Sequence, residues 1–485
     1  MASVSSEHAP RCYGRESLHM HARLFDSIPF GVQLRGVIER AYALFADGSD
    51  SSLVRRLAGL VRRLAGAAFL IRVVSAALTF VSQILLARWM GGFEFGIYIY
   101  GWTWVLLIGG MVDLGLGSAA QRFIPEYTEQ KRFTLLRGFL SGSRWLALLF
   151  GTIAGAVGAL TVKLLTPHID PSTVVPLYLS CASLPLFGVW SAQSGIARSY
   201  NWVNLGLSPV YVQRPILLLA LMGLIVMLGF PTDAVTATLV GVVALTSVGL
   251  AQVVVLNRRL AGVVEDGPRS YAARTWLAVS APIFLVEAFY YLLTYSDIIV
   301  LKQFRSAEDV AIYYAASKTI ALVSFIYYSV AQTIAHKFVE YDVSGTREGL
   351  AAFLKQSVRL TFWPSVVVII GLLALGHPLL RLFGREFTSG YYLMFIIAIG
   401  LLARASVGPA ERLLNMLGER RACALIYAAS FAISLILCVL LIPRFGLAGA
   451  AAASSIALVF ESASLFVAAK YRLGLHCFIF GGPRA

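Results

Sequence analysis

The residues that could do chemistry in this chain are the few charged side chains that interrupt its long apolar stretches. A charged side chain at the centre of a bilayer costs about 2.5 to 3.5 kcal/mol, so such residues usually pair with one another or serve a function. Arginine presents a planar fork that binds phosphate or carboxylate oxygens. The candidate anion-binding bases are Arg72, Arg214, Lys318 and Arg404, and the candidate acids for ion coupling or charge pairing are Asp113, Glu287 and Asp297.

The alternative for each of these residues is that it only pairs across the helix bundle or extends toward the membrane surface. This alternative is strongest for Arg144, which lies near one end of its apolar stretch, and for Glu461, which lies among Ala and Ser. The sequence leaves it open for the others.

The composition excludes a water-soluble enzyme. Of the 485 residues, 58% are hydrophobic and 13% are charged, whereas a soluble domain has about 25% charged residues. The net charge of +15 comes from basic residues scattered between apolar stretches, which is typical of a multi-pass membrane protein, so we expect no nucleic-acid partner. The motifs GxxxxGK[ST], HExxH and GxSxG are absent from the sequence, and we therefore expect no nucleotide, no metal, no cofactor and no covalent catalysis.

The apolar stretches predict an all-α polytopic membrane protein with about twelve transmembrane helices, because about 20 apolar residues span the hydrocarbon core. Ten or fourteen spans are the alternatives. Lys and Arg are far more frequent in the loops on the side of the N-terminus, so both termini are predicted to be cytoplasmic. The predicted spans are 67–89, 96–118, 138–165, 174–197, 207–229, 233–256, 275–300, 310–335, 357–380, 391–413, 422–442 and 447–469.

Residues 1–66 form a polar extension without the apolar core of a signal peptide. Residues 53–59 (LVRRLAG) are repeated without change at 60–66, and the leucines of this repeat share one helical face. We expect an amphipathic helix whose arginines contact lipid headgroups at the cytoplasmic surface, with docking to a partner protein as the alternative.

An internal repeat predicts two pseudo-symmetric six-helix bundles. A shift of 215 residues aligns 72–123 with 287–338, and polar residues line one face of the first and seventh spans. These residues are Arg72, Ser75, Thr79, Ser82 and Gln83 in the first span, and Glu287, Tyr290, Thr294 and Asp297 in the seventh. The predicted parts are the N-terminal bundle 67–256, a cytoplasmic connector 257–274, the C-terminal bundle 275–472 and a cytoplasmic tail 473–485.

A set of short motifs resembles the Wzx-type polysaccharide flippases of the multidrug/oligosaccharidyl-lipid/polysaccharide exporter superfamily. The first is LARWMGGFEFGIY at 86–98, followed by DLGLG at 113–117. The others follow in the family's order: SDIIVL at 296–301, AIYYAASK at 311–318, LFGREF at 382–387 and IPRFGLAGAA at 442–451. The resemblance covers residues 67–472.

The resemblance implies a V-shaped pair of bundles in the inner (cytoplasmic) membrane that moves a polyprenyl-diphosphate-linked oligosaccharide outward by alternating access. It also implies contact with membrane lipids and with a polysaccharide polymerase and its chain-length machinery. In that setting Arg72, Arg214, Lys318 and Arg404 would hold the diphosphate. Tyr290 and Thr294 would contact the glycan, and so could Tyr291, Tyr295, Tyr313, Tyr314, Tyr327 and Tyr328.

The energy source and the substrate class each have an alternative. Asp113, Glu287 and Asp297 are candidates for Na+ or H+ coupling, while the membrane potential alone could drive a diphosphate outward. A cation-coupled antiporter of organic cations in the same superfamily is the second function, and it favours an acidic cavity with fewer bases. A membrane glycosyltransferase or polymerase would need a large outer loop for its catalytic residues, and the predicted outer loops are too short for one. A purely structural scaffold would not explain why polar faces are repeated in both halves.

Overall fold

The computed structural model describes residues 51–331 and 347–480, and within them the side chains of all but 51–74, Val203 and 347–348. Helices make up almost all of this part of the chain, and it contains no strand. The helices are α3 (Ser51–Gly109), α4 (Leu116–Glu129), α5 (Phe133–Leu165), α6 (Pro171–Ser199), α7 (Val203–Ser208), α8 (Arg214–Met227), α9 (Ala234–Ala261), α10 (Ala273–Phe304), α11 (Ala307–Ile320), α13 (Arg347–Ala374), α14 (Gly376–Phe383), α15 (Tyr391–Val407), α16 (Ala410–Met416), α17 (Arg420–Phe445) and α18 (Leu447–Leu473).

Eleven segments of the described chain are long and apolar enough to span a membrane, which confirms the predicted all-α multi-pass membrane fold. The sequence predicts about twelve because it divides α3 into two spans, 67–89 and 96–118. The structure has a non-helical residue between them, Gly91, with φ 77° and ψ 167°. The exact number of crossings, the domain boundaries and the cytoplasmic placement of the termini stay predictions.

The helix breaks inside the predicted span 96–118. α3 ends at Gly109, and α4 begins at Leu116 after a turn in which Leu114 and Gly115 have φ values of 49° and 73°. The turn lies against the backbone of α10, because a Cβ added to Gly115 would be 3.1 Å from the Phe284 nitrogen. Glycine is therefore suited to this position both by its conformation and by the close approach.

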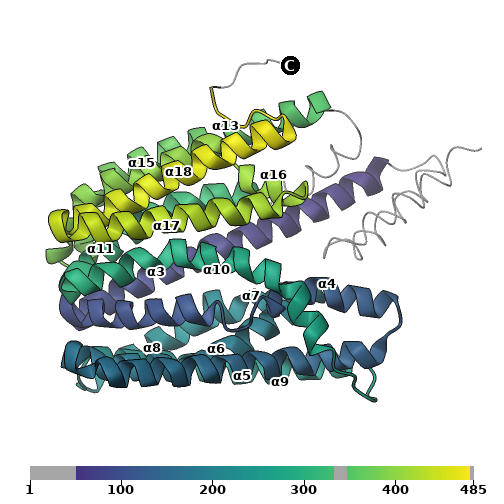
Figure 1. Cartoon of the computed structure of the whole chain (residues 1–485), viewed down its shortest axis with the longest axis horizontal. Helices are drawn as coiled ribbons and strands as arrows, with labels where there is room; N and C mark the ends of the chain where they lie inside the picture. Colours follow the sequence, from purple (N-terminus) through teal and green to yellow (C-terminus); the bar gives the residue numbers. More distant parts are fainter. Residues whose placement is uncertain (1–50, 332–346, 481–485) are drawn as a thin grey trace, which may run out of the picture.

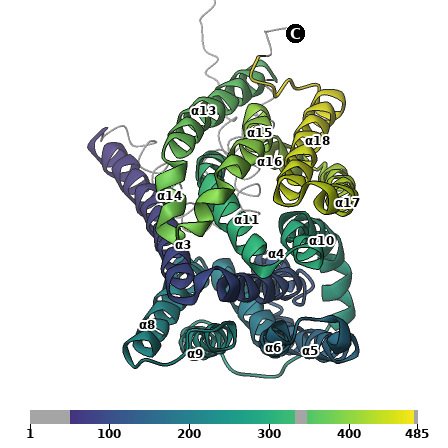
Figure 2. The ribbon, with the colours of Figure 1, turned by 90° about the vertical axis from the view of Figure 1, so that its left-hand side faces the viewer.

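The helices form two groups. Figure 1 shows α5, α6, α8 and α9 together along one side of the molecule and α13, α15, α17 and α18 along the other, with α3 and α10 between them. Figure 2 shows the same division from the end of the molecule. Within the first group α5 packs on α6, and within the second α15 packs on α18 and on α11, which belongs to this group. α3 packs on both α6 and α11, and α10 packs on both α17 and α4, which itself packs on α6. The two long helices therefore connect the groups.

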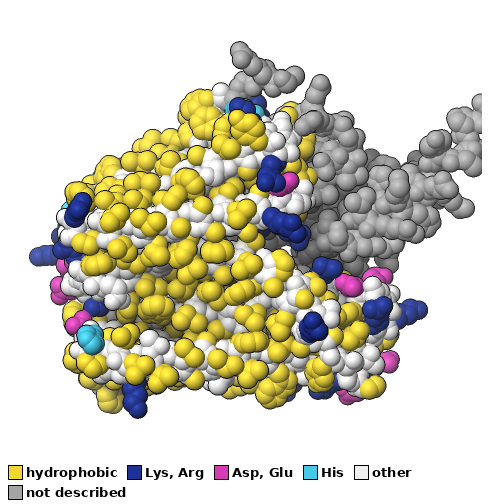
Figure 3. All heavy atoms as spheres, viewed as in Figure 1, with side chains coloured by type: hydrophobic (Ala, Val, Ile, Leu, Met, Phe, Trp, Pro, Cys, Tyr) yellow, Lys and Arg dark blue, Asp and Glu magenta, His cyan; other side chains and the backbone are white. Residues whose placement is uncertain are grey.

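The outer surface of the bundle suits a lipid environment. Large hydrophobic side chains such as Leu164, Val367 and Ile399 are more than 60% exposed. Figure 3 shows hydrophobic side chains over most of this face, with most Lys, Arg, Asp and Glu side chains near the two ends of the helices. An apolar band between charged ends is the surface that a bilayer-spanning protein presents.

Polar contacts hold the two groups together near the end of α10. Arg88 donates from Nε to the Leu382 carbonyl at 2.6 Å and from Nη2 to the Arg381 carbonyl at 2.8 Å. Lys302 forms an ion pair with Asp170 at 2.8 Å. These contacts connect α3 to α14 and α10 to the segment before α6.

Candidate substrate-binding site

Arg214 lies on the face of an aromatic ring and has no acidic partner. Its guanidinium carbon is 3.6 Å from the centre of the Trp102 ring. Its Nε and Nη2 atoms are buried and have no hydrogen-bond partner in the described part of the chain. A cation over an indole face is stabilised by the ring quadrupole, but this contact leaves the Nε and Nη2 donors unused. Arg214 can therefore donate hydrogen bonds to phosphate or carboxylate oxygens.

The local helix geometry places Arg214 at this point. Pro209–Gln213 forms a π-helix, and α8 begins directly after it at Arg214. A π-helical turn adds a residue to the turn and rotates the residues that follow relative to those before it. Pro215 lacks an N–H group and fits the first turn of α8. This irregular segment determines which way the Arg214 side chain faces.

Lys318 reaches the same aromatic cluster from the other group of helices. Its Nζ atom is 5.3 Å from the Tyr314 ring centre and 5.9 Å from the Tyr295 ring centre. Asp297 interacts with Lys318 electrostatically, but no ion pair within 4.0 Å joins Lys318 to any described acid. The Lys318 ammonium group therefore interacts with the Asp297 carboxylate at a distance, without forming an ion pair with it.

Tyr314 connects the two bases. It lies one helical turn before Lys318 on α11, and it interacts electrostatically with Arg214. Tyr98 also interacts with Arg214, and its ring stacks on Trp102 at a centroid distance of 6.5 Å. The structure therefore brings together two of the four predicted anion-binding bases, one from each group of helices, around a cluster of aromatic rings.

Arg404 lies in a different environment. Its Nη2 atom is 3.6 Å from Glu461 Oε1 and 3.9 Å from Glu411 Oε2, and its guanidinium carbon is 5.0 Å from the Tyr327 ring centre. Glu461 is fully buried. The Tyr327 hydroxyl donates to Glu411 at 3.2 Å. Arg404 is thus held in a charge network, and Glu461 forms the charge pair that the sequence favours for it.

The three remaining residues predicted to bind substrate are Arg72, Tyr290 and Thr294. Arg72 lies in α3, and its side chain is outside the described part. The Tyr290 hydroxyl is 2.8 Å from that of Tyr328, and its ring packs on Tyr427. Thr294 donates to the carbonyl of Tyr290 at 2.7 Å. Tyr290 and Thr294 therefore form contacts within the helix bundle, and their proposed contact with a glycan stays a prediction.

Asp113 stabilises the start of α4. Its carboxylate accepts hydrogen bonds from the N–H groups of Gly115 at 3.0 Å and Gly117 at 3.2 Å, and from the Ser191 hydroxyl at 2.8 Å. The first N–H groups of a helix lack partners within the helix, and a negative charge is favourable there. These contacts give Asp113 a structural role that spacing along the sequence does not show.

The other two predicted acids lie on α10 with different partners. Glu287 accepts a hydrogen bond from Ser118 at 2.6 Å, which connects α10 to α4. Asp297 accepts from the Tyr313 hydroxyl at 2.6 Å and from Ser454 at 3.1 Å. The three acids are therefore distributed over separate networks, although Glu287 and Asp113 interact electrostatically.

Sequence reasoning did not identify Trp102, Tyr98 or Glu411. Tyr98 and Trp102 are four residues apart in a predicted span, and this spacing places them on one helical face. Glu411 lies within the predicted tenth span, seven residues after Arg404, a spacing that returns to the same face of a continuous helix, although in the structure α15 ends at Val407 and α16 begins at Ala410. These signals were present, but they do not show which neighbouring helix supplies a base.

Comparison with solved structures shows the fold. An inward-facing multidrug resistance MATE family transporter of the MOP superfamily superposes with a TM-score of 0.68 and 13% identity, covering 82% of this chain and 94% of the other. The lipid II flippase MurJ in its inward closed conformation gives 0.65 and 17%, covering 83% and 87%. An outward-facing MATE family transporter gives 0.61 and 12%, covering 84% and 94%.

The sequence comparisons agree with this fold. The chain is 20% identical over 419 residues to the probable low-salt glycan biosynthesis flippase Agl15 of Haloferax volcanii, covering 83% of this chain and 84% of that protein. The family model described as "Polysaccharide biosynthesis protein" matches residues 62–335, more than half of the chain. The resemblance found in the sequence is thereby confirmed, and the chain belongs to the polysaccharide biosynthesis protein family.

Proposed function

We propose that this protein moves a polyprenyl-diphosphate-linked oligosaccharide across the inner membrane by alternating access. The observation that carries this proposal is the pair Arg214 and Lys318. The two bases come from opposite groups of helices, approach the same aromatic cluster and lack an acid within 4.0 Å in the described part of the chain. The family, the flippase relatives in sequence and structure, and the absence of a nucleotide-binding motif support it.

The diphosphate would lie between Arg214 and Lys318. Arg214 would donate Nε–H and Nη2–H to phosphate oxygens while Trp102 supports its other face, and Lys318 would act as a point charge. The rings of Tyr295 and Tyr314 offer flat surfaces against which a sugar or the diphosphate can pack. Removing two unpaired bases from water is unfavourable, so binding an anion between them restores charge balance.

Movement of the bound diphosphate requires a driving force. A diphosphate with about two negative charges gains about 2.3 kcal/mol per charge per 100 mV when it moves toward the positive outer side. Ion coupling is the second contribution, and Asp297 is the acid placed to take part, because it interacts with Lys318 electrostatically. A proton or Na+ near Asp297 would weaken its hold on Lys318 and so alter anion binding.

The same proposal indicates the step of polysaccharide biosynthesis at which this protein would act. A transported repeat unit would be joined to others outside the membrane, so a polymerase and its chain-length partner would act after this protein.

The contacts of Arg88 with the Arg381 and Leu382 carbonyls would close one end of the path while the other end is accessible, as alternating access requires.

Transport of a fluorescent lipid-linked oligosaccharide in proteoliposomes tests the proposal. Arg214→Ala and Lys318→Met should each lower the rate about tenfold or more at equal protein content, because each removes a charged contact to phosphate. Arg444→Ala, at an exposed arginine on α17, is the matched control. Unchanged transport in both variants, or transport of organic cations in place of the glycolipid, would contradict the proposal. Collapsing the potential and the proton gradient separately identifies the driving force.

A further inference from the structure

Three charged side chains in the second group of helices form a cluster in which two acids share one base. Arg404 Nη2 on α15 is 3.6 Å from Glu461 Oε1 on α18 and 3.9 Å from Glu411 Oε2 on α16. With both acids ionised, one positive and two negative charges leave the cluster with a net charge of −1. An unbalanced charge inside a helix bundle is unfavourable, so binding one positive charge would stabilise the cluster.

The two acids differ in their hydrogen bonds. Glu411 accepts hydrogen bonds from the Tyr327 hydroxyl at 3.2 Å and from the Asn415 side-chain amide at 3.4 Å. Glu461 is fully buried, and neither of its carboxyl oxygens has a hydrogen-bond partner in the described residues. Hydrogen bonds to a carboxylate favour its ionised form, and burial without them favours the neutral form. A proton that enters the cluster should therefore bind Glu461, while Glu411 keeps its charge.

The neighbouring helices offer Glu461 no second base within 4.0 Å in the described part of the chain. Arg412, which follows Glu411, forms no ion pair with a described acid. Toward α10 and α11, Asp297 and Tyr313 contact Ser454, which lies seven residues before Glu461 on α18. The titratable groups that interact with Glu461 electrostatically are Arg404, Glu411, Tyr327, Tyr427 and Cys423.

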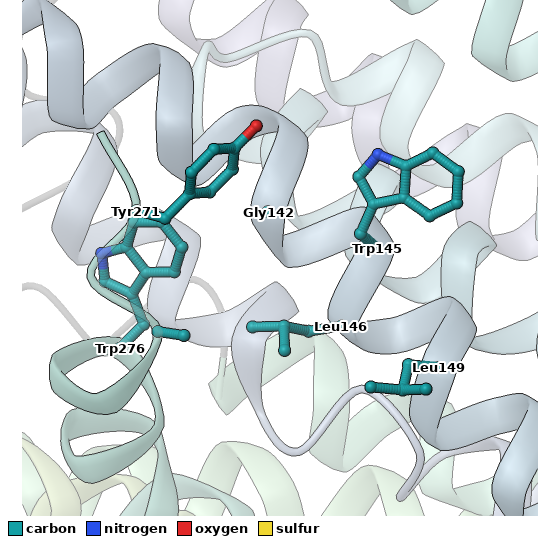
Figure 4. Close-up of a pocket in the computed structure, with 7 residues that line it drawn as sticks. Gly142, Trp145, Leu146, Leu149, Tyr271 and Trp276 are labelled. Atoms are coloured by element: carbon teal, nitrogen blue, oxygen red, sulfur yellow. The ribbon is translucent and has the colours of Figure 1, made fainter. Parts of the chain in front are cut away.

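Water can reach the cluster from one side. The side chains of Arg404 and Glu411 are 16% and 15% exposed. A void of about 10 Å³ beside Arg404 has room for about one water molecule. The polar side chains that line it are those of Arg404, Tyr327, Ser324 and Ser365. By contrast, the cavity of about 200 Å³ between α5 and the beginning of α10 is lined almost entirely by apolar side chains and has no charged group (Figure 4). Protons from solvent can therefore reach Glu461 by way of the partly exposed Glu411.

We propose that Glu461 reversibly binds a proton from the aqueous solution, and that Glu411 and Arg404 determine the pH at which it does so. One Glu461 oxygen forms the new O–H bond, the carboxylate becomes a neutral acid, and Arg404 then pairs with Glu411 alone. A metal cation fits this site less well, because it would lie next to the positive guanidinium group of Arg404. The inference does not rest on the proposed transport function, since proton binding needs no substrate.

Infrared spectroscopy of the purified full-length protein tests this proposal, because a protonated carboxyl group and a carboxylate absorb at different frequencies. The difference between the spectra of the parent and of Glu461→Gln isolates the signal of this side chain. We expect its carboxylate band at about pH 9 and its carboxylic acid band at about pH 6, where exposed glutamates, with a pKa of about 4.3, are still ionised. Glu129→Gln, at an exposed acid at the end of α4, is the matched control and should give no carboxylic acid band at either pH.

Two variants of the neighbouring charges should move the transition in opposite directions. Glu411→Gln leaves one acid for one base, so the pH at which half of Glu461 is protonated should fall by about one unit or more. Arg404→Gln removes the base, so this pH should rise by about one unit or more. Each variant is measured in its own pH-difference spectrum, which needs no reference protein, and Glu411→Gln keeps the Arg404–Glu461 pair and should fold as the parent does.

Three outcomes would overturn the proposal. The first is a parent that shows no carboxylic acid band of Glu461 at about pH 6, where exposed glutamates are ionised. The second is a transition that Glu411→Gln leaves in place. The third is a transition that shifts when Na+ replaces choline at constant ionic strength, which would assign the cluster to a metal cation.

Discussion

The guanidinium group of Arg214 and the indole ring of Trp102 are in direct face contact, with 3.6 Å between the guanidinium carbon and the ring centre. This distance is well inside the range of about 6 Å in which a cation and an aromatic ring attract each other. The contact orients the base and leaves its Nε and Nη2 donors without a hydrogen-bond partner in the described residues. An aromatic partner therefore holds the charge in place without neutralising it, as an acidic partner would.

The first prediction concerns that ring. Trp102→Leu should lower glycolipid transport by about 2- to 30-fold, since a cation–π contact contributes about 0.5 to 2 kcal/mol. Trp102→Phe should retain most of the activity because it keeps an aromatic face. Initial rates in proteoliposomes measure both variants. A leucine variant as active as the phenylalanine variant would show that the ring does not position Arg214.

The second prediction concerns the Arg404–Glu461 pair. Arg404→Leu should lower the Tm, because it leaves the fully buried Glu461 carboxylate without its base, and breaking a buried pair costs about 3 to 5 kcal/mol. Arg404→Leu/Glu461→Leu should be more stable than Arg404→Leu alone, since it removes the unpaired charge. Thermal unfolding in detergent measures this order, and a double variant less stable than the single one would contradict it.

The third prediction concerns the helix break before α4. Gly115→Ala should lower the Tm, because a left-handed backbone costs a residue with a Cβ about 1 to 2 kcal/mol and the new methyl group would press on the Phe284 backbone. Gly249→Ala is the control, since Gly249 lies within α9 and no atom is within 4 Å of its added Cβ. That variant should be neutral or slightly more stable. Equal Tm values for the two variants would show that the turn tolerates a side chain.

The fourth prediction concerns the segment after α18. Leu475, Cys477 and Ile479 are buried, and the Ile479 N–H donates to the Ser406 carbonyl at 3.1 Å. Burial raises the pKa of the Cys477 thiol to about 12. Because the thiolate is the reactive form, its fraction at pH 8 should be about one in ten thousand and should rise as the pH approaches the pKa.

Maleimide labelling of single-cysteine variants tests this burial. Cys477 should react at least about 100-fold more slowly at pH 8 than a cysteine introduced by Phe480→Cys, because Phe480 is 75% exposed. Denaturant should remove the difference. Rapid labelling of Cys477 in the folded protein would show that this segment does not cover the ends of α15 and α18.

The sequence alone predicts the membrane fold because the cost of placing polar backbone and charge in hydrocarbon leaves few solutions. Apolar length determines where helices form, so ten of the predicted spans correspond to separate helical segments. The first lies in α3 before Gly91, and the second begins in α3 after Gly91 and runs past the end of α3 into α4. The break at Leu114 and Gly115 was not predicted. It depends on Asp113, whose carboxylate binds N–H groups that only the folded turn presents.

The charged residues inside the spans can also be identified from the sequence, since each is rare and costly there. Which of them pair is decided only by the tertiary structure. Arg404 and Arg214 look alike as isolated arginines in apolar helices, yet Arg404 contacts Glu461 and Arg214 contacts Trp102. The period of a helix indicates which face a side chain occupies, but the residue opposite belongs to another helix, and only packing brings the two together.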